Sequence, residues 1–197
     1  MSIFKKSIAV LSAAVLVFGA VGCKHKIKSS ETSNNTVTEY KIGVNKYEAE
    51  MSQEVNANET IFALNSVIDA GAQTENGEHY IYLDITIKNN TDSAYTLSTL
   101  NNFRLIMPDE SEVYGHVRTQ LYATNNFTDK YFGSPFDIPA NGEFRGIVGG
   151  FVVKADQKDF TVDFFPTKEN ELDKEDVVRV KVDASKIVSP PADLIKN

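Results

Sequence analysis

The chain has 197 residues, a formal net charge of −7 and a single cysteine. Because an acidic chain lacks the clustered lysines and arginines that neutralise phosphates, nucleic acid is excluded as the expected partner. One cysteine also excludes an internal disulfide framework and a zinc site built from several cysteines.

Residues 1–22 are expected to be a signal peptide. Two lysines precede an almost wholly apolar run over residues 8–18, and small residues follow at Gly19, Ala20 and Gly22. Positive, apolar and small segments in this order are typical of secretion signals. The apolar run is shorter than the about 20 residues that cross a bilayer, so an uncleaved membrane anchor is the weaker alternative.

Cys23 directly follows Ala20-Val21-Gly22, a stretch that resembles the lipobox of bacterial lipoproteins. The resemblance implies that the Cys23 thiol receives a lipid and that the mature protein is held at the cell membrane, facing the extracytoplasmic side. That family usually has leucine at the position of Ala20. Ala-x-Gly also suits an ordinary signal peptidase, which would release the chain with a free cysteine. Lipid attachment is favoured because an exported chain would otherwise carry an unpaired reactive thiol.

Residues 23–39 are expected to be a flexible tether, because they are rich in Ser, Thr, Asn and Lys and contain few large apolar residues. Its lysines would lie beside an anionic membrane surface and be attracted to it. The folded domain is expected over residues 40–185, and residues 186–197 are expected to form a C-terminal tail.

Period-two alternation of apolar and polar residues predicts strands in the domain. The clearest run covers residues 80–88, where odd positions are aliphatic and even positions carry Tyr, Asp, Thr and Lys. Similar alternation occurs near residues 62–68, 103–107, 160–164 and 178–182. These strands are expected to contribute the core residues Ile81, Leu83, Ile85, Phe103, Leu105, Phe160, Val162, Phe164 and Val180.

Residues 143–153 are apolar on both faces and contain three glycines, which predicts a central strand with a bulge or a close backbone approach. No stretch has the 3.6-residue period of a helix of normal length. Short helical turns are conceivable at residues 169–176 and after Pro191. Seven to eight short strands joined by polar turns predict an all-β fold, an antiparallel immunoglobulin-like β-sandwich.

Three stretches carry a resemblance to a known family: "IYLDITIKNN", "FRLIMPDESEVY" and "IPANGEFRGIVGGFVV". They resemble bacterial lipoprotein domains with an immunoglobulin-like sandwich and no assigned function, which are similar in fold to an immunoprotective extracellular protein of mycobacteria. The resemblance covers about residues 59–165. Its motifs are structural, so it implies the fold and no catalytic residue.

The sequence contains no recognisable catalytic motif. His25, His79 and His116 lack the spacing of zinc ligands, and neither a Gly-x-Ser-x-Gly elbow nor a phosphate-binding loop occurs. We therefore expect no catalytic residue, no metal and no cofactor, although a site assembled from distant residues is an open alternative.

The segment from residue 114 to residue 137 is long and aromatic. Long connections on a rigid scaffold often carry function, so Tyr122, Phe127, Tyr131 and Phe132 are the candidate anchors of a recognition surface. The competing interpretation is that these rings cover an edge of the sandwich. The expected function is a membrane-anchored, non-enzymatic module that binds a protein or an envelope component. The alternatives are an accessory subunit or sensor for a small ligand, and an envelope-acting enzyme with an unrecognised site.

Overall fold

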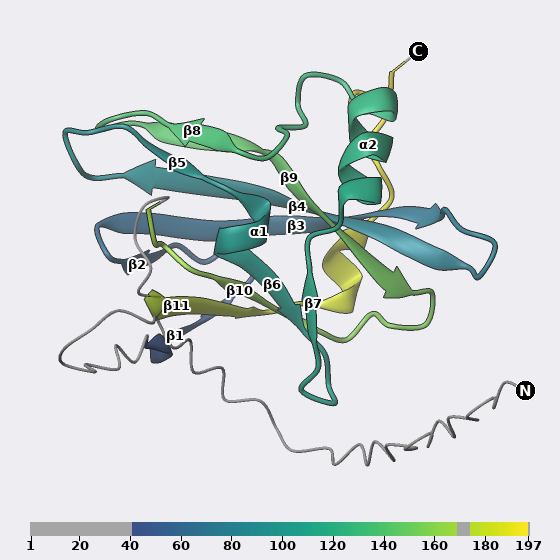
Figure 1. Cartoon of the computed structure of the whole chain (residues 1–197), viewed down its shortest axis with the longest axis horizontal. Helices are drawn as coiled ribbons and strands as arrows, with labels where there is room; N and C mark the ends of the chain where they lie inside the picture. The colour runs from purple at the N-terminus through teal and green to yellow at the C-terminus, as the bar shows by residue number, and fades with distance from the viewer. Residues whose placement is uncertain (1–40, 169–173, 197) are drawn as a thin grey trace, which may run out of the picture. The chain divides into compact units, whose positions relative to one another are not determined.

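The computed structural model describes residues 41–168 and 174–196, which belong to one compact unit (Figure 1). The expected signal peptide, Cys23 and the tether lie outside the described residues. No helix among the described residues is both long enough and apolar enough to cross a membrane.

Two five-stranded sheets form the sandwich. The first has the order β1-β11-β10-β6-β7. Its strands are β1 (Ile42–Glu50), β6 (Phe103–Ile106), β7 (Glu112–Tyr114), β10 (Thr161–Phe164) and β11 (Lys174–Lys181). The second has the order β12-β3-β4-β9, with β2 beside β3. Its strands are β2 (Val55–Ala57), β3 (Thr60–Ala72), β4 (Glu78–Asn89), β9 (Glu143–Lys154) and β12 (Ile187–Val188).

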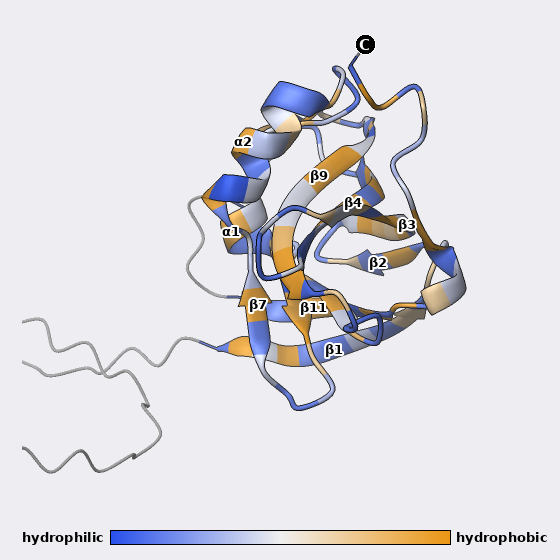
Figure 2. Cartoon of the chain, turned by 90° about the vertical axis from the view of Figure 1, so that its right-hand side faces the viewer, coloured by the Kyte–Doolittle hydropathy of each residue, from blue (hydrophilic) through white to orange (hydrophobic). Residues whose placement is uncertain are grey.

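Short elements complete the domain. Strands β5 (Tyr95–Leu97) and β8 (Phe136–Ile138) pair with each other in a separate ladder. The helices are α1 (Thr99–Asn102), α2 (Val117–Asn126) and the 3-10 turn η1 (Ala184–Lys186). In the side view of Figure 2, β1 and β11 lie on one side of the domain and β3 and β4 on the other.

The apolar faces of the two sheets meet in a single core. All nine predicted core residues are buried, with at most 2% of any of them exposed, which confirms the register predicted from the alternation. The rings of Phe62 on β3 and Phe164 on β10 stack with their centroids 4.4 Å apart and join the two sheets directly. The predicted all-β, immunoglobulin-like sandwich is thus confirmed.

Two details of the predicted sheet arrangement are wrong. The described residues form twelve strands, several of only two or three residues, and not seven to eight. The sheets are also mixed, because β1 pairs with β11 and β12 pairs with β3 in parallel. Only strands joined by a short turn must be antiparallel, and more than a hundred residues separate β1 from β11, so either direction is open to them.

Strand β9 contains the predicted bulge. Neighbouring residues of β4, Ile81 and Tyr82, pair with Phe151 and Gly149, so Gly150 is the extra residue. Its φ of +132° is one that residues with a side chain rarely adopt, and a Cβ there would overlap a side chain of α2. The same glycine therefore serves the bulge and the close approach.

The prediction that β9 is a central strand is wrong. It is the last strand in the hydrogen-bonded order of the second sheet. Both of its faces are nevertheless apolar because α2 covers the outer one. Residues 130–132 cover its edge, with Ile147 donating to the carbonyl of Lys130 at 3.0 Å and accepting from the amide of Phe132 at 2.8 Å.

Helix α2 corrects the expectation of no ordinary helix. It begins after His116, whose Nδ1 accepts a hydrogen bond from the amide of Arg118 at 3.1 Å. It lies on the outer face of the second sheet over a small second core, made by Ile68, Tyr80, Tyr82, Ala123, Phe127, Ile147 and Leu194.

The C-terminal residues are not a free tail. Leu194 is fully buried in the second core, and its carbonyl accepts a hydrogen bond from the amide of Thr128 at 2.7 Å. Residues 187–188 pair with β3 as strand β12. Of the helical turn conceivable at residues 169–176, the first five residues lie outside the described residues and the last three belong to β11.

Candidate binding surface

The four predicted anchors do not lie together on the surface. Phe127 is only 1% exposed, so the prediction that it is a surface anchor is wrong. Its ring packs edge-on against Tyr82 of the second sheet, with centroids 4.9 Å apart. Tyr122 and Tyr131 are partly buried beside it. These three rings fasten the segment to the sheet, as the edge-covering interpretation predicts.

Hydrogen bonds fix the phenol groups of this cluster. Tyr131 donates to the carbonyl of Gly149 at 3.2 Å, and Tyr82 donates to the carbonyl of Thr119 at 2.7 Å. Burial raises the pKa of Tyr131 to about 12 and also raises the pKa of Tyr82. Both phenols are therefore neutral and structural at physiological pH.

Phe132 is the predicted anchor that remains exposed, at 38%. Its ring lies over Gly146, where a Cβ would overlap it, and packs edge-on against Phe144 with centroids 4.9 Å apart. Phe132 thus presents one side of its ring while the other side covers β9.

Other apolar side chains are more exposed than the predicted anchors. Val117 and Leu121 lie one turn apart on the outer side of α2 and are 65% and 60% exposed. Leu100 of α1 reaches to Gly115, where a Cβ would lie 3.5 Å from its Cδ2, and Tyr114 precedes that glycine. We call Leu100, Tyr114, Val117 and Leu121 the α2 patch.

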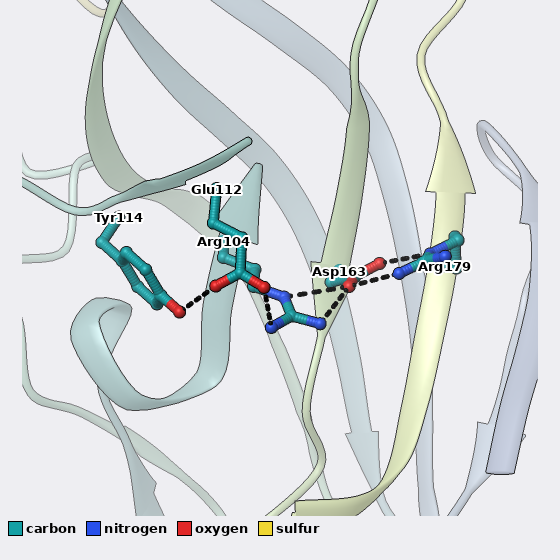
Figure 3. Close-up of polar contacts among 5 residues, drawn as sticks. All are labelled: Arg104, Glu112, Tyr114, Asp163 and Arg179. Atoms are coloured by element: carbon teal, nitrogen blue, oxygen red, sulfur yellow. Dashed lines mark hydrogen bonds and ion pairs between the residues drawn. The ribbon is translucent and has the colours of Figure 1, made fainter. Parts of the chain in front are cut away.

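Tyr114 also begins a row of side chains that crosses the outer face of the first sheet. Consecutive strands place in register Tyr114, Arg104, Asp163, Arg179 and Glu48. We call these five residues the charged row; Figure 3 shows all of it except Glu48, together with Glu112. The charges alternate in sign along the row from Arg104 to Glu48, an arrangement that favours each cross-strand pair.

Asp163 is the centre of the charged row. Its side chain is fully buried. It accepts from Arg104 Nε at 3.0 Å and Nη2 at 2.9 Å, and from Arg179 Nε at 2.7 Å and Nη2 at 2.8 Å. Four charge-assisted bonds occupy both oxygens. The carboxylate is thus a structural anchor for two guanidinium groups.

On the Arg104 side, Glu112 and Tyr114 extend this network. Arg104 Nη1 donates to Glu112 at 2.7 Å, and the Tyr114 hydroxyl donates to the same carboxylate. Hydrogen bonding to Asp163, aided by the charge of Glu48, raises the pKa of Arg179. The row therefore holds two oriented, permanently charged arginines, of which Arg104 lies beside Tyr114 of the α2 patch.

The described histidines serve local structure. His79 Nδ1 lies 2.8 Å from both carboxylate oxygens of Asp69, on the neighbouring strand, and His116 caps α2. Among residues 41–168 and 174–196, no group of three or more His, Cys, Asp or Glu could hold a metal ion.

A surface hollow of about 660 Å³ lies apart from the aromatic segment. It is lined mainly by charged side chains near Met51 and η1. A pocket among the aromatic residues would have favoured the small-ligand sensor; this hollow does not involve them.

Comparisons with known proteins concern the fold. The family model described as Domain of unknown function (DUF4352) matches residues 36–173. No curated protein matches the chain.

Three solved structures are similar to this chain. The yjhA protein of Bacillus subtilis is 13% identical, with a TM-score of 0.49 over 68% of this chain and 98% of its own. The ycdA protein of Bacillus subtilis strain 168, a presumed lipoprotein, is 13% identical, with a TM-score of 0.47 over 67% of this chain and 38% of its own. An uncharacterized β-sandwich protein of Clostridium difficile 630 is 12% identical, with a TM-score of 0.41 over 74% of this chain and 98% of its own.

Proposed function

The chain belongs to the DUF4352 family of domains of unknown function, and from that premise we propose that it is a membrane-anchored, extracytoplasmic lipoprotein whose sandwich domain binds a protein or envelope component without catalysis. The observation that carries the binding role is the α2 patch. The anchoring role depends on the sequence around Cys23.

The anchor is supported by the order of segments before Cys23. A positive start, an apolar run and small residues direct export, and the chain has no second cysteine with which Cys23 could pair. One acyl chain gives only marginal membrane binding. A diacylglycerol, aided by the lysines that follow, gives the second attraction that stable anchoring needs.

Replacing Cys23 by serine tests the anchor. The wild-type chain should incorporate a palmitate analogue and fractionate with membranes. Cys23→Ser should lose the label and release the domain as a soluble exported protein. Equal membrane retention of the two chains would disprove lipid anchoring.

The binding role is supported by the composition of the α2 patch. Three aliphatic side chains and one tyrosine are each more than half exposed on adjacent elements. Large apolar groups that gather on a protein surface mark interaction sites. Arg104 lies beside Tyr114, and Tyr and Arg are enriched among the residues that dominate binding energy. This combination fits a protein partner better than a polar glycan.

The binding test compares a double substitution in the α2 patch with a single control substitution, both in the anchored protein. A photo-crosslinking residue at position 125, on the exposed part of α2, should capture a partner in intact cells. Adding Val117→Ser and Leu121→Ser should abolish the capture, because the two substitutions remove apolar contacts of the α2 patch with the partner. Both side chains are exposed, so the substitutions should leave the fold intact. The matched control is Val188→Ser, which removes a 42% exposed valine of β12 and should leave capture unchanged. Capture that survives the first pair, or is lost equally in the control, would remove the α2 patch as the binding face.

A further inference from the structure

Strand β1 is the outer strand of the first sheet, and its second edge pairs with no strand among the described residues. Both backbone groups of Glu50 turn to Gln53: its amide donates to the Gln53 side chain at 3.0 Å, and its carbonyl accepts from the Gln53 amide at 3.1 Å. The backbone N–H and C=O groups of Glu50 therefore point away from β11.

Further along the strand, too, no described residue bonds to this edge. Pairing with β11 runs without a register shift from Asn45 to Glu50, and successive residues of a strand direct their backbone groups to alternate edges. Lys46 and Glu48 thus direct their N–H and C=O groups outward, as Glu50 does. Their side chains lie on the outer face of the sheet, because Tyr47 and Ala49 between them pack into the core. An edge with such free groups is a template for another strand.

The charged row ends at this edge. Going outward it reads Asp163, Arg179, Glu48, so a cation beside Glu48 would continue the alternation. We propose that a second copy of this chain supplies that cation: two β1 strands pair antiparallel about a two-fold axis at Tyr47, which places Lys46 of each copy opposite Glu48 of the other.

The backbone allows several registers, and the side-chain charges select one of them. With the axis at Tyr47, the outward groups of Lys46 meet those of Glu48 in the other copy, and the two symmetric pairs make four hydrogen bonds. An axis at Lys46 would oppose two lysines. An axis at Glu48 would oppose two glutamates. Like charges directly opposite each other destabilise a pair of strands.

The proposal does not depend on the anchor or on the α2 patch. Pairing of the two β1 strands joins the first sheets of the two copies into one continuous sheet, to which each copy contributes five strands. Such an isologous contact closes on itself and does not propagate into a fibre.

Cysteine crosslinking tests this register. Lys46→Cys and Glu48→Cys are made separately in the full chain, each with a different tag, and the two variants are co-expressed. Residues 46 and 48 of different copies would have Cα atoms about 5.5 Å apart in a hydrogen-bonded antiparallel pair, which suits a disulfide. Two copies of one variant would place their cysteines diagonally, about 9 Å apart, which is too far.

Mild oxidation should therefore give a disulfide between the two tags that exceeds same-variant crosslinks at least about tenfold. The wild-type chain reports any crosslink through Cys23. Equal crosslinking in mixed and single samples, or none, would overturn the proposal, as would a disulfide to a different protein.

A charge reversal gives an independent measurement. The detergent-solubilised wild-type chain should sediment as a dimer, and Lys46→Glu as a monomer, because the glutamate introduced in each copy would oppose Glu48 of the other. Lys154→Glu makes the same charge change at the end of β9 and should leave the dimer intact. A wild-type chain that sediments as a monomer at micromolar concentration, or a Lys46→Glu chain that stays dimeric, would refute the pairing.

Discussion

Replacing Asp163 by asparagine tests the energetic role of the charged row. The substitution keeps the shape of the side chain but removes the charge that four hydrogen bonds from Arg104 and Arg179 converge on. Removing one partner of a buried ion pair costs about 3–5 kcal/mol. The two arginine side chains are 14% and 24% exposed, so water relieves part of the cost, and we expect about 3 kcal/mol.

Urea unfolding followed by circular dichroism measures this loss. The midpoint should fall while the slope m stays constant, because the surface exposed on unfolding does not change. The melting temperature should fall by roughly 6–12 °C for a domain of this size. The control is Glu112→Gln, which alters a more exposed partner of Arg104 and should cost less than about 1 kcal/mol. A loss below about 1 kcal/mol for Asp163→Asn would refute the claim that Asp163 stabilises the two arginines.

Three further predictions concern the attachment of α2 to the second sheet. Phe127→Ala should destabilise the domain by about 3–5 kcal/mol in the same unfolding assay, because Phe127 is buried; a change within half a kilocalorie would place its ring in solvent. Gly150→Ala should cost at least about 1–3 kcal/mol through its positive φ alone, and its overlap with Thr119 should loosen α2, which hydrogen exchange of the helix would report. Burial raises the pKa of Tyr131 to about 12. The contribution of its neutral phenol to the free energy of unfolding is therefore fully present below the ordinary tyrosine pKa of about 10. It is lost as the pH rises from there through 12. Unfolding curves across this window should show the loss, and Tyr131→Phe should reduce it; an equal loss in both chains would contradict the assignment.

The strands of the core could be predicted because apolar and polar residues alternate along each of them, even where α2 or the arginines cover the outer face. The alternation around Leu83 fixes which residues turn inward, since a slip by one residue would expose the whole set. The sequence contains no comparable information on which distant strands pair. Strand β1 shows the difference. Its parallel partner β11 lies more than a hundred residues later in the sequence, and no turn between them constrains their relative direction.

Helix α2 could not be predicted for a physical reason. The buried residues of α2 are Thr119 and Ala123, which are both small. Val117 and Leu121 lie on the opposite, exposed side of the helix. A hydrophobic pattern assigns the larger aliphatic residues to the core, so the 3.6-residue period is hidden. Once the helix is known, these exposed aliphatic residues opposite a buried side of small residues locate the α2 patch.

The charged row was hidden for a different reason. Arg104, Asp163 and Arg179 each occupy an ordinary polar position of an alternating strand, and only the cross-strand register brings them together. A fully buried aspartate also looks like a surface residue in sequence, because the guanidinium groups that cover it come from strands about 60 and 16 residues away.

The two proposed interfaces lie at opposite ends of this row and can be separated by mutation. Tyr114 at one end belongs to the α2 patch, and Glu48 at the other belongs to the free edge of β1, with three strands between their own. Substitutions this far apart without a shared partner are expected to act independently. Leu121→Ser should therefore leave the disulfide between Lys46→Cys and Glu48→Cys unchanged, and Lys46→Glu should leave photo-crosslinking from α2 in place. If Lys46→Glu also abolished capture by α2, the partner would require the dimer, and the two surfaces would form one composite site.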